Sequence, residues 1–503
     1  MQKKQLTLVI VSLLVVVLSV SLAYFTAQII GKGKNVSVTS ANLQIVFTDS
    51  DGAISGSNIE PGWSDTKTFT IKNDTKTEYK YNIVIKDLLN TFVTNGYLKY
   101  KITSTNGGYN MTEFKDVPKS SAPKDKILAY SIVIPNGVTQ SYTIEFKYAN
   151  DESVDQSIDM GKKLSGTLFI TEGTEPTLLS QLLADKSTVL TRTDFSKVLT
   201  NDNTNTLYTS TEDSKTVYYF AGNATDNWVK FGKNESNQDL YWRIIRTNSD
   251  GSVRLLYHST STTAENAYIA SDTRFNSTVN DPMYVGYMYG TSNATAIDRS
   301  NTNNSTIKTA IDNWYKSNLE AKGYTKYLST TAVYCNDRSI TEGTYSIDSS
   351  FNYVVRTRLD TNKTPSYDCA TTEDKFTVDT STGNGKLTYP IALMTADEVA
   401  FAGGVYLDGA LAWYYYNSAK GKSTGSTDWW LLSPYSWNGE YDYASVLYVK
   451  TSNLGLGKID DTNVATRYRG VRPVLSLKSC VKIRGGDGSA SDPYTIRETT
   501  SGC

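Results

Sequence analysis

Short runs of alternating apolar and polar residues recur through the first third of the chain, and they restrict its fold more than any other feature. The runs lie at residues 43–47, 68–71, 81–85, 98–102, 127–134, 142–146 and 166–170. Alternation with a period of two places one set of side chains on one face of a strand. Turn-forming residues, such as Pro61-Gly62 and Asn136-Gly137, separate the runs. About seven antiparallel strands at this spacing predict an immunoglobulin-like β-sandwich over residues 34–173.

Residues 1–30 form an apolar segment that determines where the rest of the chain resides. Lys3 and Lys4 precede an almost purely apolar run from Leu6 to Tyr24. A basic start followed by such a run is typical of an export signal, and about 20 residues suffice to span a bilayer as a helix. The positive-inside rule keeps the lysines inside, and small residues near Ala27 leave cleavage open. The segment therefore predicts a cell-surface protein, either anchored in the membrane through residues 5–30 or secreted into the extracellular space.

The number of cysteines also supports export. The chain has four of them, Cys335, Cys369, Cys480 and Cys503. An even count in an exported chain favours disulfides. Chain order suggests that the first pairs with the second and the third with the fourth, although three pairings are possible. No C-x-x-C spacing occurs, so a redox or zinc-binding motif is not indicated.

The histidine count and the charge balance exclude several classes of function. His258 is the single histidine, so one chain cannot build a zinc site with two histidine ligands. It closes an apparent strand at residues 253–258, which favours a structural role. The chain has 50 Lys+Arg against 51 Asp+Glu and a net charge of -1, which indicates no nucleic-acid partner. We expect a protein without a cofactor or metal and without catalytic activity, although the many acidic residues leave a glycosidase pair open.

Three further regions follow the predicted sandwich. Residues 174–204 are expected to be a linker with a short helix, because leucines from 178 to 183 recur at helical spacing. Residues 205–480 mix helical and strand patterns and predict an α+β domain, and residues 481–503 are expected to be a C-terminal tail. The expected class is thus mainly β with some α.

Three elements of the α+β region have clear sequence signals. Residues 241–257 predict a hairpin, with the turn at Ser249-Asp250-Gly251. Apolar residues at helical spacing over 307–319 predict a helix capped by Ser305 or Thr306 and ended by Gly323. A second short helix is expected after residue 395, because Thr395 and Glu398 have the spacing of a capping box.

The first predicted domain resembles the camelysin and TasA-type family of exported surface and biofilm proteins. An apolar segment ending in Ala23-Tyr24-Phe25 precedes a strand at Ala41-Asn42-Leu43-Gln44-Ile45. An Ile59-Glu60-Pro61-Gly62 turn and a strand at Thr68-Phe69-Thr70-Ile71-Lys72-Asn73 follow. The resemblance covers residues 20–90 well and the remainder loosely. It implies a surface protein and, since some members form fibres, leaves a structural matrix subunit as an alternative function.

The second predicted domain is similar to a family of uncharacterised bacterial surface domains marked by WWL-x-SP and GVRPxLxL. The matching stretches are Asp428–Pro434 and Arg467–Leu477, with further likeness at Trp228–Gly232 and Tyr334–Ser339. The resemblance implies a C-type-lectin-like fold shared with formylglycine-generating enzyme. Its framework residues are Trp429, Trp430, Ser433, Pro434, Gly470, Arg472 and Pro473.

The sequence allows two predictions about these framework residues. Trp429 and Trp430 alternate on a strand, so one is expected in the core while the other faces a loop. Arg472 next to Pro473 is expected to be a buried structural pin, held by a carboxylate or by several carbonyls.

The loops between these strands are the expected recognition surface, because loops carry binding residues on a rigid scaffold. The candidate ligand contacts are Tyr435, Trp437, Asn438, Tyr441, Tyr443, Asp460, Asp461, Arg467 and Arg469. A calcium site at Trp437-Asn438-Gly439-Glu440 is a minor alternative.

The leading hypothesis is adhesion or binding of a glycan or a surface protein by a lectin-like domain on a sandwich stalk, with the oligomeric state left open. A formylglycine-generating-enzyme-like oxidase is disfavoured, because Cys335 and Cys369 do not match that family's adjacent active-site cysteines.

Overall fold

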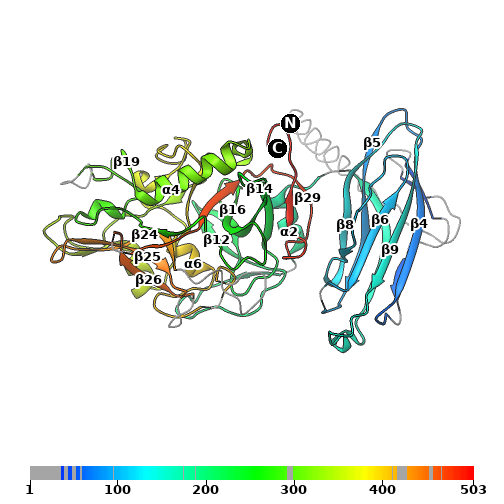
Figure 1. The fold of residues 1–503 in the computed structure, drawn as a ribbon, viewed down its shortest axis with the longest axis horizontal. Helices are drawn as coiled ribbons and strands as arrows, with labels where there is room; N and C mark the ends of the chain where they lie inside the picture. The colour runs from blue at the N-terminus through cyan, green and yellow to red at the C-terminus, as the bar shows by residue number, and fades with distance from the viewer. Residues whose placement is uncertain are drawn as a thin grey trace, which may run out of the picture. The chain divides into compact units, whose positions relative to one another are not determined.

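We describe the protein in a computed structural model (Figure 1), which describes residues 36–38, 43–47, 53–56, 59–94, 96–173, 175–186, 188–291, 298–410, 412–415, 428–451, 457–465 and 467–503. The predicted export segment at residues 1–30 lies outside this set. The chain is mainly β, with 40% strand and 12% helix, which confirms the predicted class. Within the described ranges, no helix is long and apolar enough to cross a bilayer.

The chain divides into two compact units, Met1–Glu175 and Pro176–Cys503. Each has a hydrophobic core of its own.

The first unit contains two antiparallel sheets that enclose one core. One sheet has the order β1 (Val36–Val38), β2 (Leu43–Phe47), β4 (Ser64–Asn73), β9 (Thr139–Tyr148), β6 (Leu98–Ser104), β7 (Lys115–Asp116). The other has the order β3 (Ala53–Gly56), β10 (Leu164–Glu172), β5 (Tyr79–Asn90), β8 (Ser120–Ile134). A 3-10 turn, η1 (Ser157–Asp159), precedes β10.

The predicted alternation sets the register of the first unit. Phe69 on β4 lies opposite Tyr142 on β9, and their rings stack with centroids 5.1 Å apart. Tyr81 of the other sheet donates its hydroxyl to Gln140 Oε1 at 2.6 Å. Aromatic and amide side chains from both sheets thus meet inside one buried layer.

The second unit is built on two larger sheets. The first has the order β11 (Thr188–Thr191), β12 (Thr206–Glu212), β13 (Lys215–Tyr219), β15 (Asp239–Thr247), β14 (Trp228–Lys233), β30 (Tyr494–Ile496), β29 (Ile483–Gly485). Off this path, β16 (Val253–Ser259) pairs with β15 and with β28 (Pro473–Leu477), which also pairs with β23 (Ile391–Leu393). The second sheet has the order β17 (Ala270–Thr273), β27 (Arg469–Val471), β24 (Trp429–Asn438), β25 (Tyr443–Val449), β26 (Ile459–Asn463), with β21 (Phe351–Asn352) beside β24.

Short elements complete the second unit. Two small ladders join β18 (Met288–Tyr289) to β19 (Asn303–Asn304) and β20 (Tyr334–Cys335) to β22 (Lys375–Phe376). The α-helices are α2 (Leu178–Asp185), α4 (Thr306–Tyr315), α5 (Val354–Arg356) and α6 (Ala396–Phe401). Single turns of 3-10 or π type are η2 (Pro282–Val285), η3 (Lys316–Glu320), η4 (Tyr324–Tyr327), η5 (Thr357–Thr361) and η6 (Thr372–Asp374).

The elements with clear sequence signals are confirmed. Strands β15 and β16 form the expected hairpin. Ser305 caps α4, and Gly323 adopts a left-handed φ of 76° after the π turn that follows the helix. Thr395 and Glu398 form the complete capping box of α6, because each side chain bonds the backbone of the other.

The expected linker and tail differ from the structure. Leu178 and Leu182 of α2 are each 1% exposed and belong to the core of the second unit. Strand β11 pairs in parallel with β12, and β30 from the expected tail pairs in parallel with β14. Strands β11 and β30 are too short to show a recognisable period, and β30 is also distant in sequence from its partner β14. Residues 176–204 and 481–503 are therefore integral parts of the second unit.

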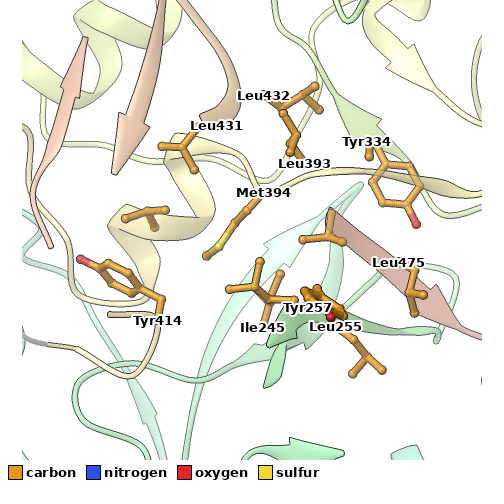
Figure 2. Packing of buried hydrophobic residues seen from close by; sticks show 14 of the residues in the cluster. Ile245, Leu255, Tyr257, Tyr334, Leu393, Met394, Tyr414, Leu431, Leu432 and Leu475 are labelled. Atoms are coloured by element: carbon orange, nitrogen blue, oxygen red, sulfur yellow. The ribbon is translucent and has the colours of Figure 1, made fainter. Parts of the chain in front are cut away.

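One apolar cluster joins the two large sheets (Figure 2). Leu393 and Met394, just before α6, pack close to Leu431 and Leu432 of β24, and Ile245 of β15 lies in the same cluster. This packing holds α6 between the sheets.

Both disulfides follow chain order, as predicted. Cys335 pairs with Cys369 and Cys480 pairs with Cys503.

Candidate functional site

The predicted contact residues of β24 lie inside the molecule. Tyr435 is 7% exposed and Trp437 only 1%. The Tyr435 and Tyr406 hydroxyl groups share a hydrogen bond at 2.6 Å, and Trp437 Nε1 donates to the carbonyl of Ile347 at 3.1 Å. A strand covered on both faces buries consecutive side chains. These two aromatic residues therefore belong to the framework and not to a contact surface.

The turn between β24 and β25 keeps its predicted residues at the surface. Asn438 Oδ1 accepts hydrogen bonds from the backbone N–H groups of Glu440 and Tyr441, at 3.0 and 3.1 Å. Tyr441 is 68% exposed, and Tyr443 is partly exposed where β25 begins. The Asn438 side chain therefore stabilises the turn that presents Tyr441.

The two predicted aspartates of β26 have different partners. Asp460 forms an ion pair with Lys458 at 3.0 Å. Asp461 accepts a hydrogen bond from the Tyr406 hydroxyl at 2.9 Å, and burial raises the pKa of this carboxyl. Adjacent residues of a strand point to opposite faces, so the pair does not form one ligand site.

The arginines at the start of β27 separate into a surface residue and a buried one. Arg467 is exposed, whereas Arg469 is buried, forms an ion pair with Asp428 and stacks 3.4 Å from the centroid of the Tyr448 ring. Between them, Tyr468 is 52% exposed, and the Arg274 guanidinium lies 4.7 Å from its ring. Sequence reasoning missed Tyr468, although it lies in the same loop as the chosen arginines.

The tryptophans of the framework depart from one expectation. Trp429 and Trp430 are both 0% exposed, so both belong to the core, and the Trp430 indole donates to the carbonyl of Thr273 at 2.7 Å. Pro434 and Pro473 are buried as well.

Ser433 and Gly470 have identifiable structural roles. Ser433 Oγ accepts a hydrogen bond from the Ala396 N–H at 2.9 Å and so caps the first turn of α6. A Cβ at Gly470 would lie 2.6 Å from the Tyr268 ring, which requires glycine there.

Arg472 is the buried pin that the sequence predicted. Its guanidinium donates to the carbonyls of Tyr257 and Tyr414, the latter at 2.7 Å, and lies over the Trp429 ring at 4.8 Å. Burial lowers its pKa to about 9.

His258 is buried beside this arginine. Its ring makes an edge contact with Trp228 at 4.6 Å. Burial, together with Arg472 and Arg243, holds its pKa well below the usual value of 6.5. The imidazole is therefore neutral and packs as a core side chain.

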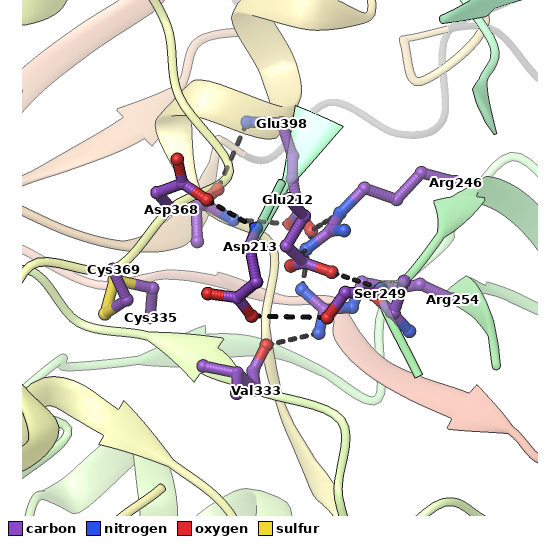
Figure 3. A network of polar contacts seen from close by, with 12 residues as sticks. Glu212, Asp213, Arg246, Ser249, Arg254, Val333, Cys335, Asp368, Cys369 and Glu398 are labelled. Carbon is purple, nitrogen blue, oxygen red and sulfur yellow. Dashed lines mark hydrogen bonds and ion pairs between the residues drawn. A yellow bond between two sulfur atoms is a disulfide. The ribbon is translucent and has the colours of Figure 1, made fainter. Parts of the chain in front are cut away.

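The densest polar cluster of the second unit surrounds Glu398 (Figure 3). Glu398 Oε1 accepts from Arg246 Nε at 2.9 Å and from Arg254 Nη1 at 2.7 Å, and Arg246 also pairs with Glu212 at 2.8 Å. All four side chains are at most 6% exposed. Burial acts to raise the pKa values of Glu212 and Glu398, but the arginines outweigh it and lower both. Sequence reasoning identified Glu398 as a helix cap and missed the network, whose members are distant in sequence.

A small polar cavity borders this network. Its volume is about 10 Å³, and its lining includes Cys335 of the first disulfide. Such a volume holds about one water molecule. Arg358 closes one side, with ion pairs to Asp397 at 2.8 Å and Asp337 at 3.0 Å. Because each of these carboxylates is held by an arginine, the arrangement stabilises the fold and does not present a free acid or base to a substrate.

Within the described ranges, no group of three or more His, Cys, Asp or Glu side chains could hold a metal ion.

Comparisons with known proteins give no similar protein. No family model matches the chain, and neither a curated protein nor a solved structure does so.

Proposed function

We propose that this chain is an exported bacterial cell-surface protein whose second unit binds a glycan or another surface protein. The apolar segment with its basic start supports export. Two disulfides support an oxidising, extracellular environment. The resemblances to surface and lectin-like families point in the same direction.

The observation that carries the proposal is the position of the exposed tyrosines. Among the described residues, Tyr441 and Tyr468 are the two most exposed aromatic side chains. Tyr441 lies in the turn between β24 and β25, and Tyr468 immediately precedes β27 of the same sheet. Strands β24, β25 and β26 lie at the end of the second unit remote from β29 (Figure 1). Tyrosine supplies rigid contact area for sugars and proteins at a low entropic cost.

Neighbouring residues hold the backbone of Tyr441 and the ring of Tyr468. Asn438 fixes the backbone of the turn at Tyr441, and the Arg274 guanidinium stacks over the Tyr468 ring. A loop or side chain ordered before binding loses less entropy when a ligand contacts it. Asn438 and Tyr443 lie beside Tyr441 in the turn after β24, whereas Arg467 precedes Tyr468 at the other end of that strand, where Gly470 pairs with Trp429. Each tyrosine thus has hydrogen-bonding groups of its own that can orient a polar ligand.

An array of glycans and matrix proteins, probed with the purified full chain with and without calcium, tests the proposal. We expect a ligand whose affinity falls about tenfold or more in Tyr441→Ala or Tyr468→Ala. Leu190→Ala is the matched control, because Leu190 is 45% exposed on β11 of the other sheet. Unchanged binding in both tyrosine variants, or no binding by folded protein, would contradict the proposal.

A structural matrix subunit is the second candidate, since within the described residues β8 pairs with β5 alone and leaves one edge open. Pro123 and Lys124 lie on this strand, and its pairing with β5 is interrupted by several register shifts. Proline, lysine and bulges are features that oppose strand addition at an edge. We therefore favour the binding function. Filament formation by the full chain, abolished by a change on β8, would reverse this preference.

A further inference from the structure

A cavity of about 250 Å³ lies beside β14 and β30, on the other large sheet of the second unit. Its polar lining comes from Lys230, Asp239, Arg484, Thr495 and Glu498. The volume is below that of pockets for drug-sized ligands, which start at about 300 Å³. It therefore suits a small organic molecule below drug size.

The backbone explains why a cavity forms here. Strand β14 pairs in parallel with β30 at Val229↔Tyr494 and Lys230↔Thr495. On its other side, the register with β15 shifts between Lys230 and Lys233. Bulges of this kind bend a strand and interrupt its pairing. Phe231 and Ile496, which are almost completely buried, supply the apolar part of the lining.

The charged side chains that line the cavity differ in the number of hydrogen bonds and ion pairs that they form. Asp239 forms ion pairs with Lys233 at 2.5 Å and with Lys230 at 3.7 Å, so its charge is compensated. Glu498 accepts one hydrogen bond, from the Tyr324 hydroxyl at 3.0 Å. The side chain of Arg484 has no hydrogen bond or ion pair to any described residue. One exposed guanidinium and one exposed carboxylate, the latter also near the Lys233 charge, thus line the cavity with hydrogen-bonding capacity open to a ligand.

We propose that this cavity binds an α-amino acid group. The ligand's carboxylate accepts paired hydrogen bonds from Arg484, a geometry that guanidinium groups favour. Its ammonium donates to Glu498, and a small aliphatic side chain rests on Phe231 and Ile496. Arg484 and Glu498 are both exposed, so water solvates them in the free protein. A zwitterion can pair with both charges at once, which a neutral sugar cannot do.

Isothermal titration of the full chain tests this assignment. L-alanine is the first ligand, propionate lacks the ammonium group, and Nε-acetyl-lysine carries the same group at the end of a longer molecule. We expect saturable binding of alanine with a Kd of about 1 mM or lower, and weaker binding of propionate. If Nε-acetyl-lysine binds as well as alanine, the natural ligand can be a longer molecule ending in this group, and if it does not, a free amino acid is indicated.

Three variants locate the site. Arg484→Gln should weaken alanine binding about tenfold or more, the range expected for a charged hydrogen-bonded contact. Glu498→Gln should abolish the preference for alanine over propionate. Lys316→Gln, at an exposed lysine outside the cavity, is the control and should bind as the unaltered chain does.

Absence of saturable binding in the folded chain, equal binding of propionate and alanine, or unchanged affinity in Arg484→Gln would each overturn the assignment. The cavity and the exposed tyrosines lie on different sheets, so failure here leaves the proposed surface-binding function untouched.

Discussion

Removing the charge of Glu398 should destabilise the second unit strongly. Glu398→Gln keeps the size of the side chain and one carbonyl oxygen, so the change isolates charge from packing. In the folded protein, Arg254 would lose the one carboxylate that it pairs with among the described residues, while Arg246 would keep Glu212. Breaking a buried ion pair by removing one partner costs about 3–5 kcal/mol, because the remaining charge stays buried. We expect a loss near the lower end of this range, since Arg254 retains the Val333 carbonyl.

Two variants provide matched comparisons for this effect. Glu212→Gln leaves Glu398 bridging both arginines, so we expect a smaller loss of about 1.5–3 kcal/mol, the value of a charged hydrogen bond. Glu440→Gln removes an exposed carboxylate in the turn before β25 and should change stability by less than about 0.5 kcal/mol.

Guanidinium unfolding followed by tryptophan fluorescence provides the assay. Of the eight tryptophans, Trp63 alone belongs to the first unit, so the signal reports mainly on the second. If Glu398→Gln unfolds within about 1 kcal/mol of the unaltered chain, the network contributes little net stability and the reasoning fails.

The pH dependence gives an independent check on the same residue. The folded pKa values of Glu398 and Glu212 lie below the usual 4.5. Their contribution to stability is therefore present above pH 4.5 and is lost as the pH falls through the folded pKa values. The difference in stability between the unaltered chain and Glu398→Gln should accordingly shrink below pH 4.5.

Three further perturbations test other parts of the second unit. Because His258 is neutral when folded and has a pKa near 6.5 when unfolded, stability should fall below pH 6.5 by up to about 1.4 kcal/mol per pH unit. Unfolding curves of His258→Phe should lack this slope, and an unchanged slope would refute the assignment. Replacing both Cys335 and Cys369 with serine opens a loop with a sequence separation of 34 and should cost about 4 kcal/mol in denaturant unfolding. Gly470→Ala places a methyl group against the Tyr268 ring and should cost about 1–3 kcal/mol, measured in the same way.

Local signals in the sequence predicted local structure well. The hairpin of β15 and β16, the capping box at Thr395 and the cap at Ser305 depend on residues within a few positions of each other. The alternating runs of the first unit likewise correspond to its strands, because one buried face is enough to produce the pattern. These features need no knowledge of distant parts of the chain.

Contacts between distant segments could not be predicted in the same way. Glu398 meets Arg246 across a separation of 152 residues, and β30 pairs with β14 although nothing in either strand specifies the other. A short strand such as Tyr494–Ile496 carries too few residues for a recognisable period. The pairing of the expected tail through β30 was not predicted for this reason, since composition alone cannot reveal a partner strand elsewhere in the chain.

The burial of Tyr435 and Trp437 has a consequence for any search for the ligand. Aromatic residues in a distinctive motif invite the interpretation that they contact a ligand, but β24 lies in the middle of its sheet and is packed on both faces. Trp437→Ala would remove a side chain that is 1% exposed, and such truncations cost about 3–5 kcal/mol of stability. Lost binding in that variant would therefore report unfolding as readily as a missing contact. Tyr441→Ala separates the two, because its side chain is mostly in solvent and its removal should leave the unfolding midpoint unchanged while it weakens binding.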